Sequence, residues 1–243
     1  MKKILLTLTV VIFITKTAIA LDMQPSTSPT NLEYSYKAYK NKNHIYTANI
    51  IARPCVLKNS CLGVFTTVKG DKIIEINTCY IDTQNQILKV HQESHNDLDK
   101  TYFIWDIDNT KETATSKYIN LKTNQEQTNS FKFLKDGLTI QSFLSLLPNI
   151  QLKPGYTFDF PLLVPPDYFH YLTMTVITTE SINTIDGEIE CYRLELRISG
   201  LFGMILPKCS FWVRKKPPHI PYKYEEPNTT YILDSYQIKE KKE

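Results

Sequence analysis

The sequence predicts a mostly β protein, built as an antiparallel meander with one short helix. Apolar and polar residues alternate with a period of two over successive segments, as expected for strands that bury one face. Polar turns separate these segments at regular intervals, which is typical of an antiparallel meander. The chain is also rich in aromatic and β-branched residues, with 15 tyrosines, which favours pleated, half-buried surfaces.

Residues 1–20 have the pattern of a secretory signal peptide. Lys2 and Lys3 form a basic start, an apolar run follows at 4–15, and Ala18-Ile19-Ala20 fits the small-x-small cleavage rule. The apolar run is shorter than the about twenty residues needed to span a bilayer. We therefore expect a cleaved bacterial signal peptide, a secreted or periplasmic protein, and no transmembrane segment in the mature chain.

The mature chain is expected to form one domain. Residues 21–32 are rich in Ser, Thr and Pro and indicate a disordered leader. A single antiparallel β domain is expected over 33–238, followed by a charged tail at 239–243. Its first strand patterns are NKNHIYTANII, VFTTVKGDKIIEINTCYI with a turn at Lys69-Gly70-Asp71, ILKVHQESH, TYFIWDID and SKYINLKTN.

The alternation is interrupted by the segment DGLTIQSFLSLLPN. Asp136 and Thr139 are candidate helix caps, and Pro148 is a stop signal. We expect an amphipathic helix at about 138–147 that covers one end or face of the sheet, with a ligand-gating role as an alternative. Its apolar residues stand at helical spacing: Ile140, Phe143, Leu144 and Leu147.

Strand patterns then resume up to the C-terminal tail. They are GYTFDFPLLV, YLTMTVITTESI, GEIECYRLELRIS, CSFWVRKK, HIPYKYEE and TTYILDSYQ. In the third of these, Tyr192 and Leu194 alternate with Cys191, Arg193 and Glu195. We expect the first set to face the core and the second set to face water.

Five cysteines in an exported chain indicate disulfides with one thiol left over. Cys55 and Cys61 flank a short loop. Cys191 and Cys209 are nearly symmetric about Gly200, so a hairpin turning there would place them opposite each other. Both pairs are disulfide candidates, and a bridge requires close Cα atoms that the sequence spacing does not guarantee.

Three sequence segments follow one another in a characteristic order from Phe133 onward. They are FLKDGLTIQSFLSLLPNIQLKPGYTFDFPL, VITTESINTIDGEIECYRLEL and SFWVRKKPPHIPYKYEE. With these features the chain resembles an uncharacterised family of exported bacterial domains, grouped by shape near the lipoprotein carriers of the Lol system. The resemblance implies a strongly curved antiparallel sheet or half-open barrel, with the helix packed on its concave side. It implies no catalytic residues, and related carriers hold acyl chains in the concave cavity.

The charge balance does not indicate a nucleic-acid partner. The formal net charge of the whole chain is +3. Lys2, Lys3 and Lys16 lie in the predicted signal peptide, which has no acidic residue, so the mature chain is formally neutral. Nucleic-acid binding is therefore not expected.

The segment KVHQESHNDLD, at 89–99, has two histidines and a glutamate in close succession. An H-E-x-x-H zinc motif requires a glutamate directly after the first histidine, where this chain has Gln92. On a strand, His91 and His95 share a face but lie about 13 Å apart, too far for one zinc ion. We interpret the segment as the outer face of a strand that enters a turn, and expect no metal.

The sequence contains no other recognisable catalytic motif. It has neither a G-x-S-x-G elbow nor a phosphate-binding glycine loop. The acid pairs Asp106–Asp108 and Glu225–Glu226 are ordinary for strand ends, and nothing beside Cys79 would lower its pKa, so that thiol is expected to stay free and inert. We expect a protein that is not an enzyme and has no cofactor.

The second half of the chain is rich in aromatic residues. A curved sheet with one helix either fills its interior with them or leaves an apolar cavity that binds a lipid or another apolar ligand. The candidate cavity-lining residues are Phe143, Leu147, Phe158, Tyr192, Leu194, Trp212 and Tyr224. The leading hypothesis is a protein of envelope biogenesis that binds an apolar small molecule or lipid. The alternatives are an interaction module for envelope proteins without a cavity, and a hydrolase that uses a metal or carboxylates.

Overall fold

The protein folds as one antiparallel sheet with a single short helix in the part of the chain described here. The computed structural model describes residues 31–239 except 57–59, 83–85, 98–99, 109–110, 112, 132–136, 165–167 and 201–207. The predicted signal peptide and most of the predicted leader and tail lie outside the described residues. The strands are β1 (Asn31–Lys40), β2 (Asn43–Val56), β3 (Ser60–Lys69), β4 (Ile73–Asp82), β5 (Ile87–Asn96), β6 (Thr101–Asp108), β7 (Thr113–Asn120), β8 (Gln125–Ser130), β9 (Thr157–Val164), β10 (Tyr168–Thr184), β11 (Gly187–Ile198), β12 (Cys209–Arg214), β13 (Pro221–Glu225) and β14 (Thr230–Lys239).

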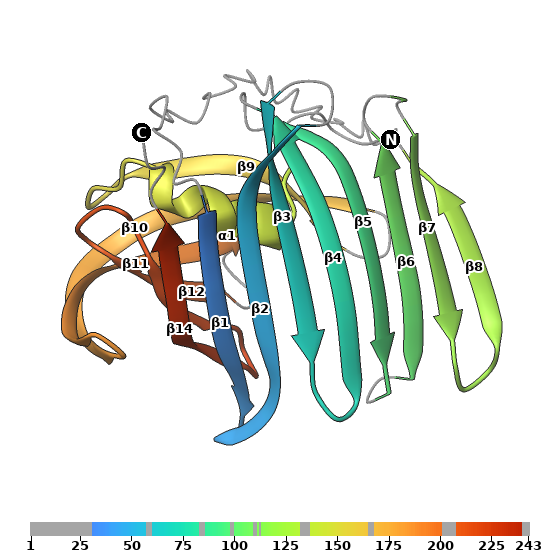
Figure 1. The fold of residues 1–243 in the computed structure, drawn as a ribbon, viewed down its shortest axis with the longest axis horizontal. Helices are drawn as coiled ribbons and strands as arrows, with labels where there is room; N and C mark the ends of the chain where they lie inside the picture. The colour runs from blue at the N-terminus through green and yellow to red at the C-terminus, as the bar shows by residue number, and fades with distance from the viewer. Residues whose placement is uncertain are drawn as a thin grey trace, which may run out of the picture.

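Two meanders share this sheet. Strands β1 to β8 follow one another in sequence order, and so do β9 to β14, while β1 pairs with β14 where the two meanders meet. In the described chain β8 and β9 form the two ends of the sheet, which is therefore not closed. Figure 1 shows the sheet bent back on itself, with β9 and β10 crossing behind the first strands. The predicted curved antiparallel meander is confirmed.

Side-chain alternation explains why these segments are strands. In β1, Leu32, Tyr34, Tyr36 and Ala38 are buried while their neighbours are partly exposed, so one face of the strand meets the core. None of the predicted strand segments covers β1 or β8. β1 begins at Asn31, inside the predicted leader, because its pairing with β2 and β14 orders these residues.

The helix α1 spans Ile140–Leu146, and a 3-10 turn follows at Leu147–Asn149. Thr139 caps it in a reciprocal arrangement with Ser142: the Ser142 backbone N–H donates to the Thr139 hydroxyl (3.2 Å), and the Thr139 N–H donates to the Ser142 hydroxyl (2.8 Å). The predicted helix, its Thr139 cap and its end near Pro148 are confirmed; Asp136 lies outside the described residues.

The helix lies inside the bent sheet and joins two apolar clusters. It packs against β3 and β4 on one side. On the other side the Phe143 ring stacks on Phe160 of β9, with 5.1 Å between ring centroids, and meets Phe211 of β12 edge-on. Leu144 packs against both clusters, so α1 adds a contact between the two meanders on the concave side.

One expectation for β11 is wrong. Cys191 and Glu195 were expected to face water, but both are buried. Cys191 belongs to the cluster formed with the first meander, because the bent sheet brings apolar residues against both faces of β11. Glu195 is buried, and it forms ion pairs with the exposed side chains of Arg197 and Lys208.

Candidate functional site

A cavity of about 330 Å³ lies between α1 and the concave face of the sheet. Its wall is formed by strands β1–β5, β13 and β14 together with one face of α1. The apolar part of the wall consists of Tyr36, Ala48, Ile50, Val68, Ile73, Ile140, Leu144 and Pro221. The polar part consists of Tyr46, Thr66, Glu75, Gln92, Ser94, Asn96, Tyr224, Glu226 and Tyr231.

Strand register explains how polar groups gather on one side of this cavity. Val64, Cys79 and Val90 stand side by side across β3, β4 and β5 and form an apolar row beside the helix, where Cys79 contacts the Thr139 cap. Two residues along the strands, the corresponding row is polar and buried: Thr66, Asn77 and Gln92. The concave face thus changes from apolar to polar over two residues along each strand, which is the distance between successive side chains on one face.

The next row places a carboxyl group in the cavity. Glu75 of β4 stands between Val68 of β3 and Ser94 of β5. Burial raises the pKa of Glu75 to about 7, and hydrogen bonds from Gln92 and Ser94 oppose this rise only in part. Near neutral pH this side chain therefore exchanges between its neutral and its ionised form.

A second carboxyl group, Glu226, lies just after β13 and is bound by tyrosines. The Tyr224 hydroxyl donates to Glu226 Oε1 at 2.6 Å, and the Tyr231 and Tyr46 hydroxyls lie 2.7 Å apart. Burial raises the pKa of Glu226, which these tyrosine contacts oppose. The charges of Glu75 and Glu226 both act on Tyr46, so the two carboxyl groups belong to one electrostatic unit.

The close approach of β2 to the β3–β4 turn depends on a glycine. A Cβ atom on Gly70 would lie 2.5 Å from the Ile45 carbonyl oxygen and 2.7 Å from the Tyr46 Cβ. Only glycine therefore fits at this turn without moving the backbone of β2. Because Tyr46 lines the cavity, Gly70 fixes part of the cavity wall.

Six of the seven predicted cavity-lining residues are buried and lie outside this cavity wall. Tyr224 lines it. Phe143, Leu147, Phe158, Tyr192 and Leu194 pack in the cluster between α1 and the second meander. Trp212 instead donates its indole N–H to Glu180, and Lys223 lies 4.4 Å above the ring.

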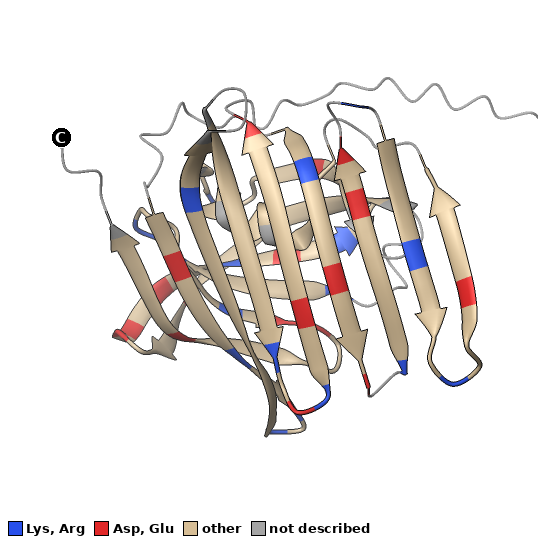
Figure 2. Ribbon diagram, turned by 45° about the vertical axis from the view of Figure 1, so that its right-hand side comes forward, with Lys and Arg blue, Asp and Glu red and all other residues tan. Residues whose placement is uncertain are grey.

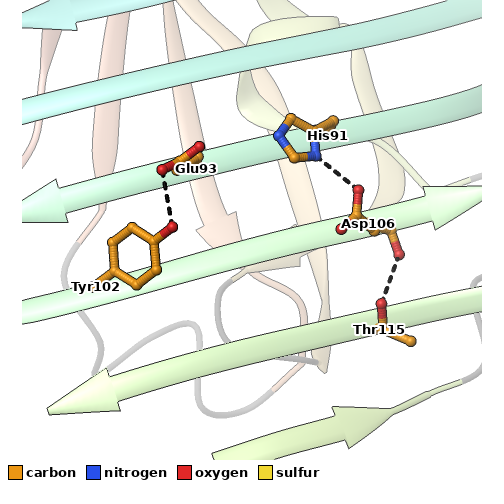
Figure 3. A network of polar contacts seen from close by, with 5 residues as sticks. All are labelled: His91, Glu93, Tyr102, Asp106 and Thr115. Carbon is orange, nitrogen blue, oxygen red and sulfur yellow. Dashed lines mark hydrogen bonds and ion pairs between the residues drawn. The ribbon is translucent and has the colours of Figure 1, made fainter. Parts of the chain in front are cut away.

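The histidine segment forms strand β5, as predicted, and its histidines point away from the cavity. His91, Glu93 and His95 are exposed, while Gln92 and Ser94 between them are buried. Figure 3 shows the outer-face contacts: His91 Nδ1 lies 2.7 Å from Asp106 Oδ1, and the Tyr102 hydroxyl donates to Glu93 at 2.9 Å. In the described residues no group of three or more His, Cys, Asp or Glu could hold a metal ion.

Acidic and basic residues are both distributed along the described chain. Figure 2 shows Lys and Arg interspersed with Asp and Glu over the strands and turns, without a large region of one sign. No helix of the described chain is long and apolar enough to cross a membrane.

Comparison with known proteins places the chain in a family. A family model described as a protein of unknown function (DUF3108) matches residues 56–229, more than half of the chain. The chain belongs to the DUF3108 family. The match begins well before Phe133, so the DUF3108 region includes most of the first meander as well as the features noted in the sequence.

Solved structures similar to this DUF3108 chain are distant. A Bacteroides fragilis protein assigned as exported and with a YmcC-like fold is 8% identical, covering 85% of this chain and 95% of that chain, with a TM-score of 0.28. A chain of the Pseudomonas aeruginosa MucA/MucB complex is 11% identical, covering 90% of this chain and 97% of that chain, with a TM-score of 0.14. No curated protein matches the sequence.

The DUF3108 chain has one of the two expected disulfides. Cys55 and Cys61 are joined, whereas Cys191 and Cys209 are free thiols. The expected second bridge is not formed because Cys209 stands opposite Leu196, five residues along β11 from Cys191. At about 3.3 Å per residue the two cysteines are about 16 Å apart along the strand, beyond the reach of a disulfide.

The polar residues of the DUF3108 cavity were not identified from the sequence, although the sequence contains a signal for them. In β5, His91 and Glu93 on one face are polar, and so are Gln92 and Ser94 on the other. A strand that packs on an apolar core has one apolar face. Polar residues on both faces therefore indicate that the inner face lines a polar cavity.

Proposed function

We propose that this protein is an exported, non-enzymatic binding protein of the bacterial envelope, which holds an apolar ligand or lipid in the cavity beneath α1. The observation that carries the proposal is the cavity itself, with apolar walls and a few convergent polar groups. Its volume of about 330 Å³ falls at the lower end of the about 300–1,000 Å³ typical of ligand sites.

The placement of the polar groups supports binding rather than catalysis. The residues that line the described cavity include two carboxyl groups, but no histidine, cysteine, lysine or arginine. Each carboxyl group is hydrogen-bonded to neutral side chains, which orient it and do not activate a nucleophile. A carboxyl group with a raised pKa in such a cavity is a common marker of functional sites.

The proposal is tested by purifying the protein from the periplasm of its own bacterium and recording native mass spectra. We expect an added mass that extraction with organic solvent releases and identifies as an apolar molecule or lipid. Ala48→Phe fills the cavity from β2 and should reduce retained ligand and the affinity for an added long-chain alcohol by about tenfold.

Asn49→Phe is the matched control, because Asn49 follows Ala48 on the same strand and is exposed on the opposite face. This variant should retain the ligand. A wild-type protein that carries no ligand and binds no long-chain alcohol would contradict the proposal, as would equal binding by the two variants.

A further inference from the structure

We infer that Glu75 selects the ligand, and that the cavity binds an amphiphile with an aliphatic body and a primary ammonium group that pairs with the Glu75 carboxylate. This inference rests on the proposed function and names the chemical class of its ligand.

The charges of the cavity wall are the first argument. The charged side chains that line the described cavity are Glu75 and Glu226, and both are acidic. Glu75 lies near the start of β4, between β3 and β5, with Val68 as its neighbour on β3. A carboxylate ligand would be repelled by Glu75 and Glu226, whereas an ammonium group would be attracted by both.

The second argument is an unpaired polar atom in the same wall. Thr66 lines the cavity one strand away from Glu75, is 3% exposed, and its hydroxyl has no hydrogen-bond partner in the described structure. Buried hydroxyl groups are normally paired, so an unpaired one in a cavity wall indicates a position where a ligand group can bind. An ammonium group has three donors and can use a carboxylate and a hydroxyl together.

The volume limits the size of the aliphatic body. At about 30 Å³ for a water-sized group, the cavity holds on the order of ten such groups. A ten-carbon chain is therefore a suitable probe. Its apolar part would contact Ile50, Val68 and Leu144, which line the same cavity.

Protonation gives a specific signature of this pairing. Glu75 is faced by Gln92 and Ser94 from β5, by Tyr46 from β2 and by Tyr231 from β14, and Glu226 adds a further negative charge. Burial holds the pKa of Glu75 near 7, so part of the population is protonated at neutral pH. An ammonium ion would favour the carboxylate, so its binding should release protons into the buffer.

The experiment compares n-decylamine, n-decanol and n-decanoic acid by isothermal titration calorimetry at pH 7, in buffers with different ionisation enthalpies. For the wild-type protein we expect decylamine to bind at least about tenfold more tightly than decanoic acid. We also expect proton release with decylamine and not with decanol. Glu75→Gln should lower decylamine affinity about tenfold and abolish most of the proton release, with a smaller effect on the affinity for decanol.

Glu93→Gln is the matched control, because Glu93 lies on the neighbouring strand with its side chain on the exposed outer face. It should bind all three probes like the wild-type protein. Decanol binding without a preference for decylamine, or decylamine binding unaffected by Glu75→Gln, would overturn the inference and leave the proposed function standing. Failure of all three probes to bind would instead overturn the proposed function.

Discussion

Asn77 and Gln92 face each other across β4 and β5, and the Asn77 Nδ2 atom donates to Gln92 Oε1 at 3.1 Å. Both side chains are almost completely buried on the concave face of the sheet. The Asn77 Oδ1 atom has no partner in the described structure. The hydrogen-bonding capacity of this buried pair is therefore only partly used. The pair lies beside the cavity, between the apolar row that contains Cys79 and the row that contains Glu75.

A double-mutant cycle on this pair has a clear expected outcome. Asn77→Leu leaves the Gln92 Oε1 atom without its donor, and Gln92→Met leaves the Asn77 amide without its acceptor; each variant should lower the free energy of unfolding by about 1–3 kcal/mol. The double variant should be less destabilised than the sum of the single variants, because no unpaired partner remains. Urea unfolding of the four proteins measures this, and additive effects would contradict a coupled pair.

The stability of the protein should depend on pH through Glu75. The carboxyl group titrates near pH 4.5 in the unfolded chain and near pH 7 in the folded chain. Between these values the folded state holds a proton that the unfolded state has lost, so the free energy of unfolding falls as the pH rises. Well above pH 7 Glu75 is ionised in the folded protein, and its burial lowers the free energy of unfolding by up to about 3 kcal/mol.

Glu75→Gln removes this titration and should therefore stabilise the protein at pH 8 relative to the wild type, with little difference at pH 4.5. Urea midpoints at the two pH values measure the effect. Glu226 also has a raised pKa, so the variant should keep part of the pH dependence. A variant that is equally stabilised at both pH values would show that Glu75 does not act through its charge.

The cysteines give a prediction that a mass spectrometer can test. Alkylation of the denatured, non-reduced protein should label three thiols, since Cys55 and Cys61 are bridged. In the native protein Cys79 and Cys191 should react slowly, because burial raises their pKa values to about 12 and about 11. A single labelled thiol in the denatured protein would indicate a second bridge that the strand register excludes.

The helix cap should matter for stability and for the cavity. Thr139→Ala removes the hydroxyl that accepts from the Ser142 backbone and should lower the free energy of unfolding by about 1–2 kcal/mol. Ile140 and Leu144 of the same helix line the cavity, so binding of a long-chain alcohol should weaken as well. Thr139→Ser keeps the hydroxyl group and is the control that should preserve both stability and binding.

Local patterns predicted the helix and most strands of the fold. The cap at Thr139, the stop near Pro148 and the turn at Gly70 each follow from chemistry within a few residues. β8 escaped prediction because its residues, QEQTNS, are polar on both faces, and only its pairing with β7 defines it. Such tertiary effects cannot be found by local alternation.

The candidate site was harder to predict, because residues far apart in the sequence build it. Aromatic residues such as Phe143 and Phe158 predicted an apolar cavity, but they fill the space between α1 and the second meander. The cavity lies further along the concave face, where Thr66, Glu75 and Ser94 come together only through the register of β3, β4 and β5. That register is not encoded in any single strand.

The pairing of β1 with β14 has a consequence for the order in which the protein can be built. Among the described residues, the first strand and the last strand are neighbours in the interior of the sheet, and Tyr231 of β14 lines the cavity beside Tyr46 of β2. During synthesis each meander can form its hairpins as its strands emerge, but the junction between them forms only after β14 has been made. The cavity is thus completed last, and a chain cut short before β14 cannot complete it.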